Sequence, residues 1–203
     1  MSSTNRGATR VTNDYYPTPA WAVRAILPWL IVPGVNMGRR ILEPACGEGA
    51  IANEIVAHGI PATSLTLVDV SPLADEASLP AGARYERADF LQWAPAARER
   101  GEEFDLIITN PPYTLALDFV QAALTLAGPT GRVVMLLRLN FLGSQKRAAW
   151  MRAHTPDIFV LPKRPSFVGQ GTDSCEYAWF RWWGTQPNNH GSLRVLELPT
   201  EGT

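Results

Sequence analysis

The sequence predicts an α/β fold built on a doubly wound, mostly parallel sheet with helices on both faces. Three segments, ILEPA (41–45), SLTLVDV (64–70) and FDLIITN (104–110), are near-continuous apolar runs of strand length, as expected for strands that are covered on both sides. A helical pattern follows the first run, and the connections after it are long enough to hold helices or turns. Alternating strands and helices pair in parallel. A glycine-containing turn follows the first run, at the position where such sheets bind nucleotides.

The remaining elements follow in chain order. Residues 1–12 are polar and are expected to form a mobile arm, followed by one catalytic domain over 13–203 with no separate target-recognition domain. The last two strands lie about a dozen residues apart with no helical pattern between them, which favours an antiparallel pair. We expect helices near 19–30, 47–59, 114–127 and 145–153, and further strands at 83–89, 132–138, 157–162 and 175–183, seven strands in all.

Composition narrows the classes of protein that remain. With 203 residues and 46% hydrophobic content, the chain can bury one sizeable core. No run approaches the roughly 18 apolar residues of a membrane span, and the polar start lacks a signal-peptide core, so a cytoplasmic location is expected. Cys46 and Cys175 have no neighbours at metal-ligand spacing, so we expect reduced thiols and no metal.

Charge is unevenly distributed along a chain whose formal net charge is only −1. Residues 41–105 hold 12 acidic and 4 basic side chains, whereas residues 131–185 hold 8 basic and 3 acidic ones. One side of the molecule is therefore expected to be basic. Ordinary solvated faces would explain this as well, so the asymmetry supports a nucleic-acid partner only together with other signs.

The loop after the first strand carries a candidate cofactor site. Gly47 and Gly49 permit a tight turn against which a ligand can lie. The dinucleotide pattern GxGxxG is absent, and Glu43 precedes the loop. A carboxylate there would repel a pyrophosphate and attract the sulfonium and ammonium groups of S-adenosylmethionine, which favours that cofactor over NAD.

Two further acids end the next strands. Asp69 closes the second strand, where a carboxylate can accept ribose hydroxyl hydrogens. Asp89 closes the third, where it can accept the hydrogens of an adenine amino group while Phe90 packs the ring. Each acid alone could be a helix cap or a turn residue; three acids ending three successive strands favour a cofactor site.

The motif Asn110-Pro111-Pro112-Tyr113 follows the fourth strand and is the candidate catalytic loop. Two prolines remove backbone donors, so the carbonyls of the turn are expected to face outward as acceptors with no internal partner. The Asn110 amide oxygen and the Pro111 carbonyl can together accept both hydrogens of a planar NH2 group, while Tyr113 stacks on the ring that bears it. A proline-rich turn capping the next helix is the alternative.

Taken together, these segments resemble the class I, Rossmann-like methyltransferases that modify amino groups, in particular the N6-adenine DNA enzymes of small phage and prophage type. The opening NDYYPTPAWAV (13–23) is similar to their amino-terminal cofactor motif, and LPKRPSFVGQGTDSCEYAWFRWW (161–183) is similar to their late region. The resemblance implies a cytoplasmic enzyme of phage or prophage origin. The residues expected to bind S-adenosylmethionine are Tyr16, Thr18, Pro19, Glu43, Pro44, Ala45, Cys46, Gly47, Gly49, Asp69, Val70, Asp89, Phe90 and Asn110.

The DNA contacts are expected in the late region and on Tyr113. We expect Phe167 to be an exposed aromatic that contacts the second face of an everted base, with Lys146, Arg147, Lys163 and Arg164 as candidate phosphate contacts. Enzymes that methylate duplex adenine usually carry a recognition domain, and the chain leaves no room for one. A short or relaxed target sequence, or help from a second copy of the chain, is therefore expected.

Several other functions remain open. The motif at 110–113 also serves enzymes that methylate an RNA base or a protein glutamine amide, and N4-cytosine enzymes more often carry Ser in place of Asn110. A protein substrate would not require Phe167 or its basic neighbours. A non-catalytic binding module of the same fold would be free to lose Asn110, Asp69 and the glycine loop, all of which are intact.

Overall fold

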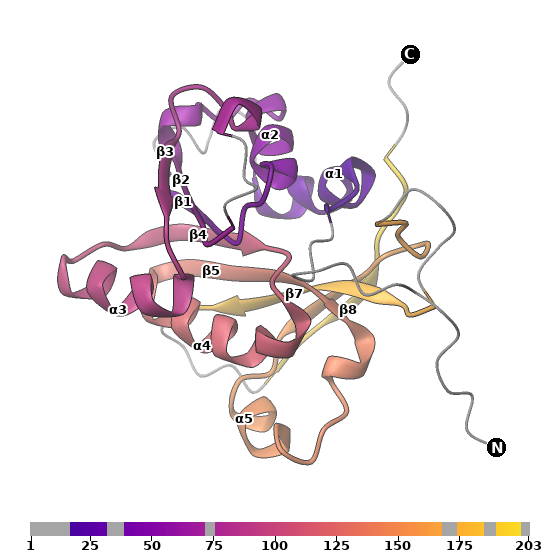
Figure 1. Ribbon diagram of the computed structural model, residues 1–203. Coiled ribbons are helices and arrows are strands. Elements are labelled where there is room, and N and C mark those ends of the chain that lie inside the picture. Colours follow the sequence, from indigo (N-terminus) through magenta and orange to yellow (C-terminus); the bar gives the residue numbers. More distant parts are fainter. Residues whose placement is uncertain (1–16, 32–38, 72–75, 168–173, 185–189, 200–203) are drawn as a thin grey trace.

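The structure is a computed structural model that describes residues 17–31, 39–71, 76–167, 174–184 and 190–199. Its centre is one sheet with the strand order β3-β2-β1-β4-β5-β7-β6-β8 (Figure 1). The strands are β1 (Ile41–Pro44), β2 (Leu65–Asp69), β3 (Arg84–Arg87), β4 (Phe104–Thr109), β5 (Ala127–Arg138), β6 (Asp157–Val160), β7 (Tyr177–Trp183) and β8 (Leu193–Val195). The helices are α1 (Ala20–Leu30), α2 (Ala50–Ala57), α3 (Phe90–Glu99), α4 (Ala116–Leu126) and α5 (Ala148–Ala153).

The pairing confirms the predicted fold class. Strands β3, β2, β1, β4 and β5 pair in parallel, and β7 is antiparallel to both β5 and β6. All seven predicted strands are present. The sheet has one more strand than predicted, because β8 adds to β6 in parallel at the edge. Its three residues all have exposed side chains, so the burial pattern that marks the other strands is missing there.

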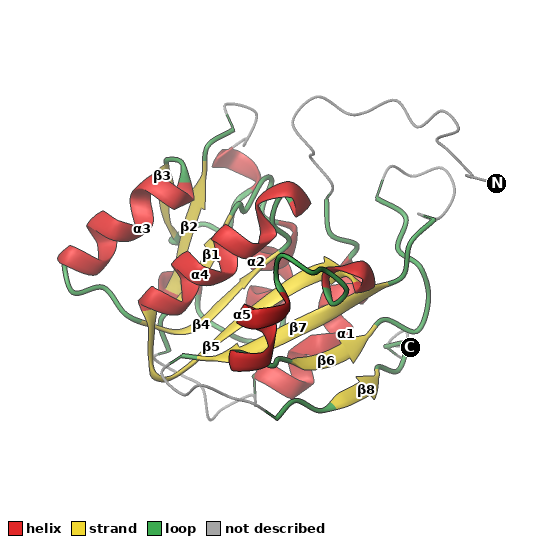
Figure 2. Cartoon of the chain, turned by 90° about the horizontal axis from the view of Figure 1, so that it is seen from below, coloured by secondary structure: helices red, strands yellow, loops and turns green. Residues whose placement is uncertain are grey.

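Two layers of helices cover the sheet (Figure 2). Alternate residues of β4 and β5 point to opposite faces: Leu106 and Val134 pack with α1 and α2, whereas Ile107 and Val133 pack with α3 and α4. This alternation follows from the two-residue period of a strand. Helix α3 was not predicted as a separate element, and it begins where the Asp89 side chain accepts a hydrogen bond from the Leu91 amide.

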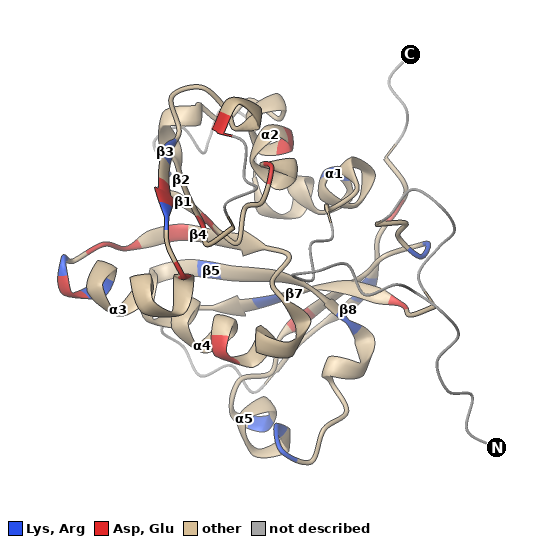
Figure 3. Ribbon diagram, in the orientation of Figure 1, with Lys and Arg blue, Asp and Glu red and all other residues tan. Residues whose placement is uncertain are grey.

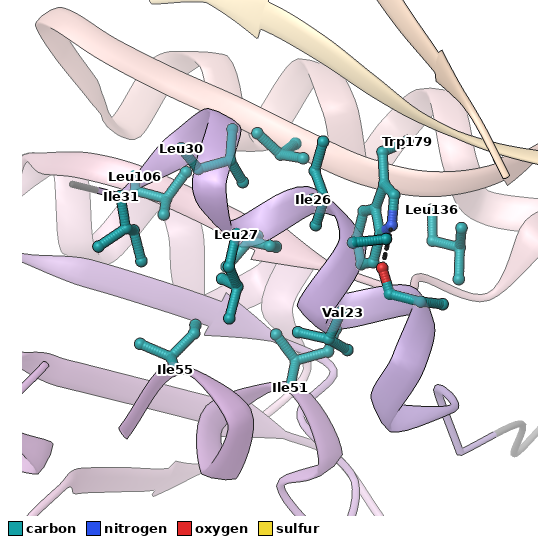
Figure 4. Close-up of a cluster of buried hydrophobic side chains, with 14 of the residues drawn as sticks. Val23, Ile26, Leu27, Leu30, Ile31, Ile51, Ile55, Leu106, Leu136 and Trp179 are labelled. Atoms are coloured by element: carbon teal, nitrogen blue, oxygen red, sulfur yellow. Dashed lines mark hydrogen bonds between the residues drawn. The ribbon is translucent and has the colours of Figure 1, made fainter. Parts of the chain in front are cut away.

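A buried tryptophan attaches α1 to the sheet. Trp179 of β7 is fully buried, and its indole nitrogen donates a hydrogen bond of 2.9 Å to the Ala22 carbonyl oxygen (Figure 4). Val23, Ile26 and Leu27 of α1 face the same cluster, together with Ile51 of α2. Helices α1 and α2 are thereby held side by side on one face of the sheet.

The predicted arm, residues 1–12, and the cofactor candidate Tyr16 lie outside the described residues. In the part of the chain that the structure describes, no helix combines the length and apolar character needed to cross a membrane.

We predict that Trp179→Ala lowers the free energy of unfolding by about 3–5 kcal/mol, because it leaves a cavity beneath α1 and removes the hydrogen bond to the Ala22 carbonyl. Urea denaturation followed by circular dichroism measures this loss. The matched control is Trp183→Ala in the same strand. Trp183 is 37% exposed, so its removal is expected to cost about 1 kcal/mol or less. Equal losses for the two variants would contradict the assignment.

Candidate active site

The candidate site lies where the carboxyl ends of β1, β2 and β4 meet. Strand β1 pairs in parallel with β2 on one side and with β4 on the other, so the loops that follow all three strands leave the same edge of the sheet. The buried Thr109 hydroxyl at the end of β4 donates a hydrogen bond to the Pro44 carbonyl at the end of β1. The glycine loop and the Asn110 loop are therefore connected where they leave their strands. Thr109, which makes this connection, was not predicted from the sequence as a site residue.

The glycine loop uses left-handed backbone conformations. Gly47 and Gly49 have φ of 52° and 77°, and Ala45 adopts a φ of 64°. A Cβ at Gly49 would approach Leu79 Cδ2 to 2.9 Å, so both the backbone conformation and the space require glycine there. The turn ends at Ala50, the first residue of α2, whose amino-terminal amides face the loop.

Asp69 organises this loop. One carboxylate oxygen of Asp69 accepts the Gly47 amide at 2.7 Å and the other accepts the Ser71 amide at 2.6 Å. The side chain is 8% exposed. Each carboxylate oxygen can accept more than one hydrogen bond, so these contacts leave acceptor capacity for a ligand hydroxyl. Val70 follows directly and is largely exposed at the sheet edge.

Glu43 is a buried carboxylate beneath the loop. Its side chain is 1% exposed, and its Oε2 atom has no hydrogen-bond partner among the described residues. Burial raises the pKa of Glu43 well above its ordinary value, a hydrogen bond from the Ala52 backbone opposes this rise, and the Asp69 charge adds to it. A cation placed at this edge would stabilise the ionised form. The positively charged methionine end of S-adenosylmethionine therefore fits the residues present.

Cys46 lies between these acids and stays protonated. Burial raises the pKa of its thiol first, and the charges of Glu43 and Asp69 raise it further. A thiol held in this form is a poor nucleophile and metal ligand. No group of three or more metal-binding side chains occurs within the described ranges.

Asp89 and Phe90, the two predicted cofactor residues at the third strand, have different surroundings. Asp89 is half-buried and is the N-cap of α3, as its Oδ1 atom accepts the Leu91 amide at 2.9 Å. Phe90 is only 3% exposed and packs against the Phe119 ring at 5.1 Å, in the core between α3 and α4. The expectation that Phe90 packs on a bound ring is corrected: its side chain belongs to the core.

The four residues of the catalytic candidate leave β4 together. Asn110 is half-buried and Pro111 is buried, and Tyr113 opens a short 3-10 turn, η3 (Tyr113–Leu115). The Pro112 carbonyl accepts the Leu115 amide at 2.9 Å. The expectation that the carbonyls of this turn have no internal partner is therefore wrong for Pro112, whose carbonyl closes the turn.

An aromatic cluster surrounds Tyr113. The buried Tyr177 at the start of β7 lies 5.6 Å from the Tyr113 ring and 5.2 Å from the Phe167 ring. Arg138, the last residue of β5, has its guanidinium carbon 4.9 Å from the centre of the Tyr113 ring. Arg138 and Tyr177 were not predicted from the sequence as site residues. Arg138 follows the same rule as Asp69 and Asn110, a polar residue at the carboxyl end of an apolar strand.

The late-region candidates differ from expectation in their surroundings. Phe167 is 6% exposed, so the expectation of an exposed aromatic is wrong. Arg147 lies on the Phe141 ring and donates to the Phe141 carbonyl, and Arg164 is paired with Glu176. Lys163 lies over the Trp21 ring, and Lys146 is exposed. At the amino-terminal motif, Thr18 is buried and Pro19 is the N-cap of α1.

The strand order and the site edge define the class I methyltransferase fold. SMU.776, solved complexed with SAH, shares 17% sequence identity with the chain at a TM-score of 0.56, over 74% of this chain and 46% of that one. TrmN from Thermus thermophilus shares 24% at a TM-score of 0.55, over 80% and 48% respectively. At these levels of identity, the two structures show that the fold is shared.

Sequence comparison supplies the family. The methyltransferase small domain model matches residues 25–138, and the chain belongs to this family. The type II methyltransferase M.TthHB8I of Thermus thermophilus is 39% identical over 97 residues, which are 47% of this chain and 20% of that protein. The matched part thus spans about a fifth of this relative, and the family match covers β1 to β5 with both loops of the candidate site.

We predict that Glu43→Gln makes the protein more stable above pH 5 but weakens binding of S-adenosylmethionine. The unfolded chain ionises this carboxyl near its ordinary pKa of 4.5, whereas in the folded protein its pKa is raised. The wild-type protein therefore loses stability as the pH rises above 4.5, and the amide avoids this loss. Thermal denaturation between pH 4 and pH 8 should show a midpoint difference that grows with pH.

Isothermal titration calorimetry should show the opposite effect on the cofactor, with affinity reduced roughly tenfold or more because a charge-assisted contact is lost. The control is Glu54→Gln on α2, which removes a surface ion pair with Arg24. This substitution is expected to change neither the pH dependence of stability nor the cofactor affinity much. Unchanged cofactor affinity in Glu43→Gln would contradict the proposed contact.

Proposed function

We propose that this protein transfers a methyl group from S-adenosylmethionine to the N6 amino group of adenine in DNA. The observation that carries the proposal is the position of Asn110-Pro111-Pro112-Tyr113. The motif leaves the carboxyl end of β4, one strand away from the glycine loop and the buried Glu43. An amine held by this motif would therefore face a cofactor held by that loop.

The residues of the chain would act chiefly by positioning. The Asn110 amide oxygen and the Pro111 carbonyl would accept the two hydrogens of the target amine, which localises the nitrogen lone pair. Tyr113 would stack on the ring. S-adenosylmethionine supplies a methyl carbon made electrophilic by its sulfonium. On transfer the amine nitrogen would gain this methyl group, the sulfur of the leaving thioether would keep the electrons of the carbon–sulfur bond, and the extra proton of the amine would pass to water.

Two observations support DNA as the substrate. The relative M.TthHB8I is a type II methyltransferase. Strands β5 and β7 and helix α5 carry basic side chains and no acidic ones, whereas acidic side chains outnumber basic ones around β1 to β4 and α3 (Figure 3). A polyanion would approach the basic elements, and Arg138 of β5 lies beside Tyr113.

We predict that Asn110→Ala lowers methyl transfer by at least about a hundredfold while binding of S-adenosylmethionine changes less than about threefold, because the variant loses an acceptor that acts on the reacting amine. Transfer of labelled methyl should be measured in parallel on unmethylated DNA, RNA and a protein extract. Asn140→Ala is the matched control, since Asn140 is an exposed asparagine beyond the end of β5.

Label in DNA that disappears in Asn110→Ala supports the proposal. Label confined to RNA or to protein would contradict the choice of substrate, and full activity of Asn110→Ala on DNA would contradict the role of the motif.

A further inference from the structure

The cluster around Tyr113 contains two residues, Tyr177 and Arg138, that have no role in the proposed methyl transfer. Tyr177 is 1% exposed and makes ring contacts with both Tyr113 and Phe167. Arg138 is half-buried at the end of β5 and is the register partner of Tyr177 across the antiparallel pair. Both residues come from the ends of paired interior strands of the sheet, whereas Tyr113 lies in a turn.

Their contacts converge on the Tyr113 ring. The Arg138 Nε atom donates a hydrogen bond of 2.9 Å to the Tyr177 hydroxyl. This bond holds the guanidinium over Tyr113, with its central carbon 4.9 Å from the ring centre, while it lies 5.9 Å from the Tyr177 ring. The tyrosine that would stack on the target ring is thus fixed by a cation over the ring and by a buried ring at an angle of 50°.

Resting on the proposed function, we propose that Arg138 and Tyr177 form a positioning pair that sets the orientation of the Tyr113 ring and thereby the position of the target base. The pair acts through Tyr113, without bonding to the reacting amine. A turn residue stacked on a substrate gains accuracy when its own conformation is fixed by neighbours on strands. The antiparallel register of β5 and β7 places both members of the pair correctly.

Two substitutions separate the parts of the pair. Tyr177→Phe removes only the hydroxyl that orients the guanidinium, and we expect kcat for DNA methylation to fall about fivefold. Arg138→Gln removes the cation over Tyr113, and we expect a fall of roughly tenfold or more. Arg138→Lys keeps the charge but loses the planar group, so its activity should lie between those of Arg138→Gln and the wild type.

A double-mutant cycle with Tyr113→Ala tests whether the pair acts through Tyr113. In that background Arg138→Gln should cause little further loss, since the ring that it positions is gone. In the single variants, S-adenosylmethionine affinity and the unfolding midpoint should stay close to the wild-type values while kcat falls. If the pair had a merely structural role, the midpoint or the affinity would fall together with kcat. Arg100→Gln, which removes a similar contact with Trp93 on α3, is the matched control.

The outcomes separate this inference from the proposed function. If wild-type protein methylates DNA but Arg138→Gln and Tyr177→Phe match it, the inference fails alone. If Arg138→Gln lowers kcat equally in the wild-type and Tyr113→Ala backgrounds, the inference is also overturned, because the guanidinium would then act on the nucleic acid directly. Methylation of RNA or protein instead of DNA would overturn the proposed function, and the same cycle on that substrate would decide the inference. Transfer to none of the three would overturn both.

Discussion

The parallel pairing of β1 with β2 and β4 is the constraint on which the candidate site depends. It places the ends of three strands at one edge, so residues distant in sequence meet there. Two hydrogen bonds then fix the loops: Thr109 to the Pro44 carbonyl, and the Gly47 amide to Asp69. The first joins β4 to β1 and the second joins the loop after β1 to the end of β2, so neither is available before the sheet forms. The loops thus inherit their geometry from the sheet.

The buried Glu43 shows a tension between stability and binding. An uncompensated carboxylate in the core disfavours the folded state or takes up a proton. Residues that weaken a fold in this way are typical of sites where a ligand supplies the missing charge. Its neighbours Cys46 and Asp69 do not relieve the cost, since the thiol is neutral and the second acid is negative. A cationic ligand relieves it, which is why we connect Glu43 with S-adenosylmethionine.

The fold could be predicted from the sequence because the central strands are apolar runs and helical patterns follow the first and fourth of them. The edge strand β8 could not, because Leu193 and Val195 have exposed side chains and only pairing with β6 orders them. At the site, the strand-end acids and the 110–113 motif were found. The burial of Phe90 and Phe167 was not, since sequence position cannot tell a core aromatic from a ligand-facing one. Arg138 stands at a strand end like Asp69, but its pairing with Tyr177, 39 residues away, could not be predicted from the sequence.

We propose that the edge formed by β1 and β4 delivers a methyl group to adenine N6. Mass spectrometry of nucleosides from unmethylated plasmid DNA, treated with the protein and deuterium-labelled S-adenosylmethionine, tests this proposal. We expect labelled N6-methyladenine as the modified nucleoside. Labelled N4-methylcytosine, or unmodified DNA from a protein that binds S-adenosylmethionine, would contradict it.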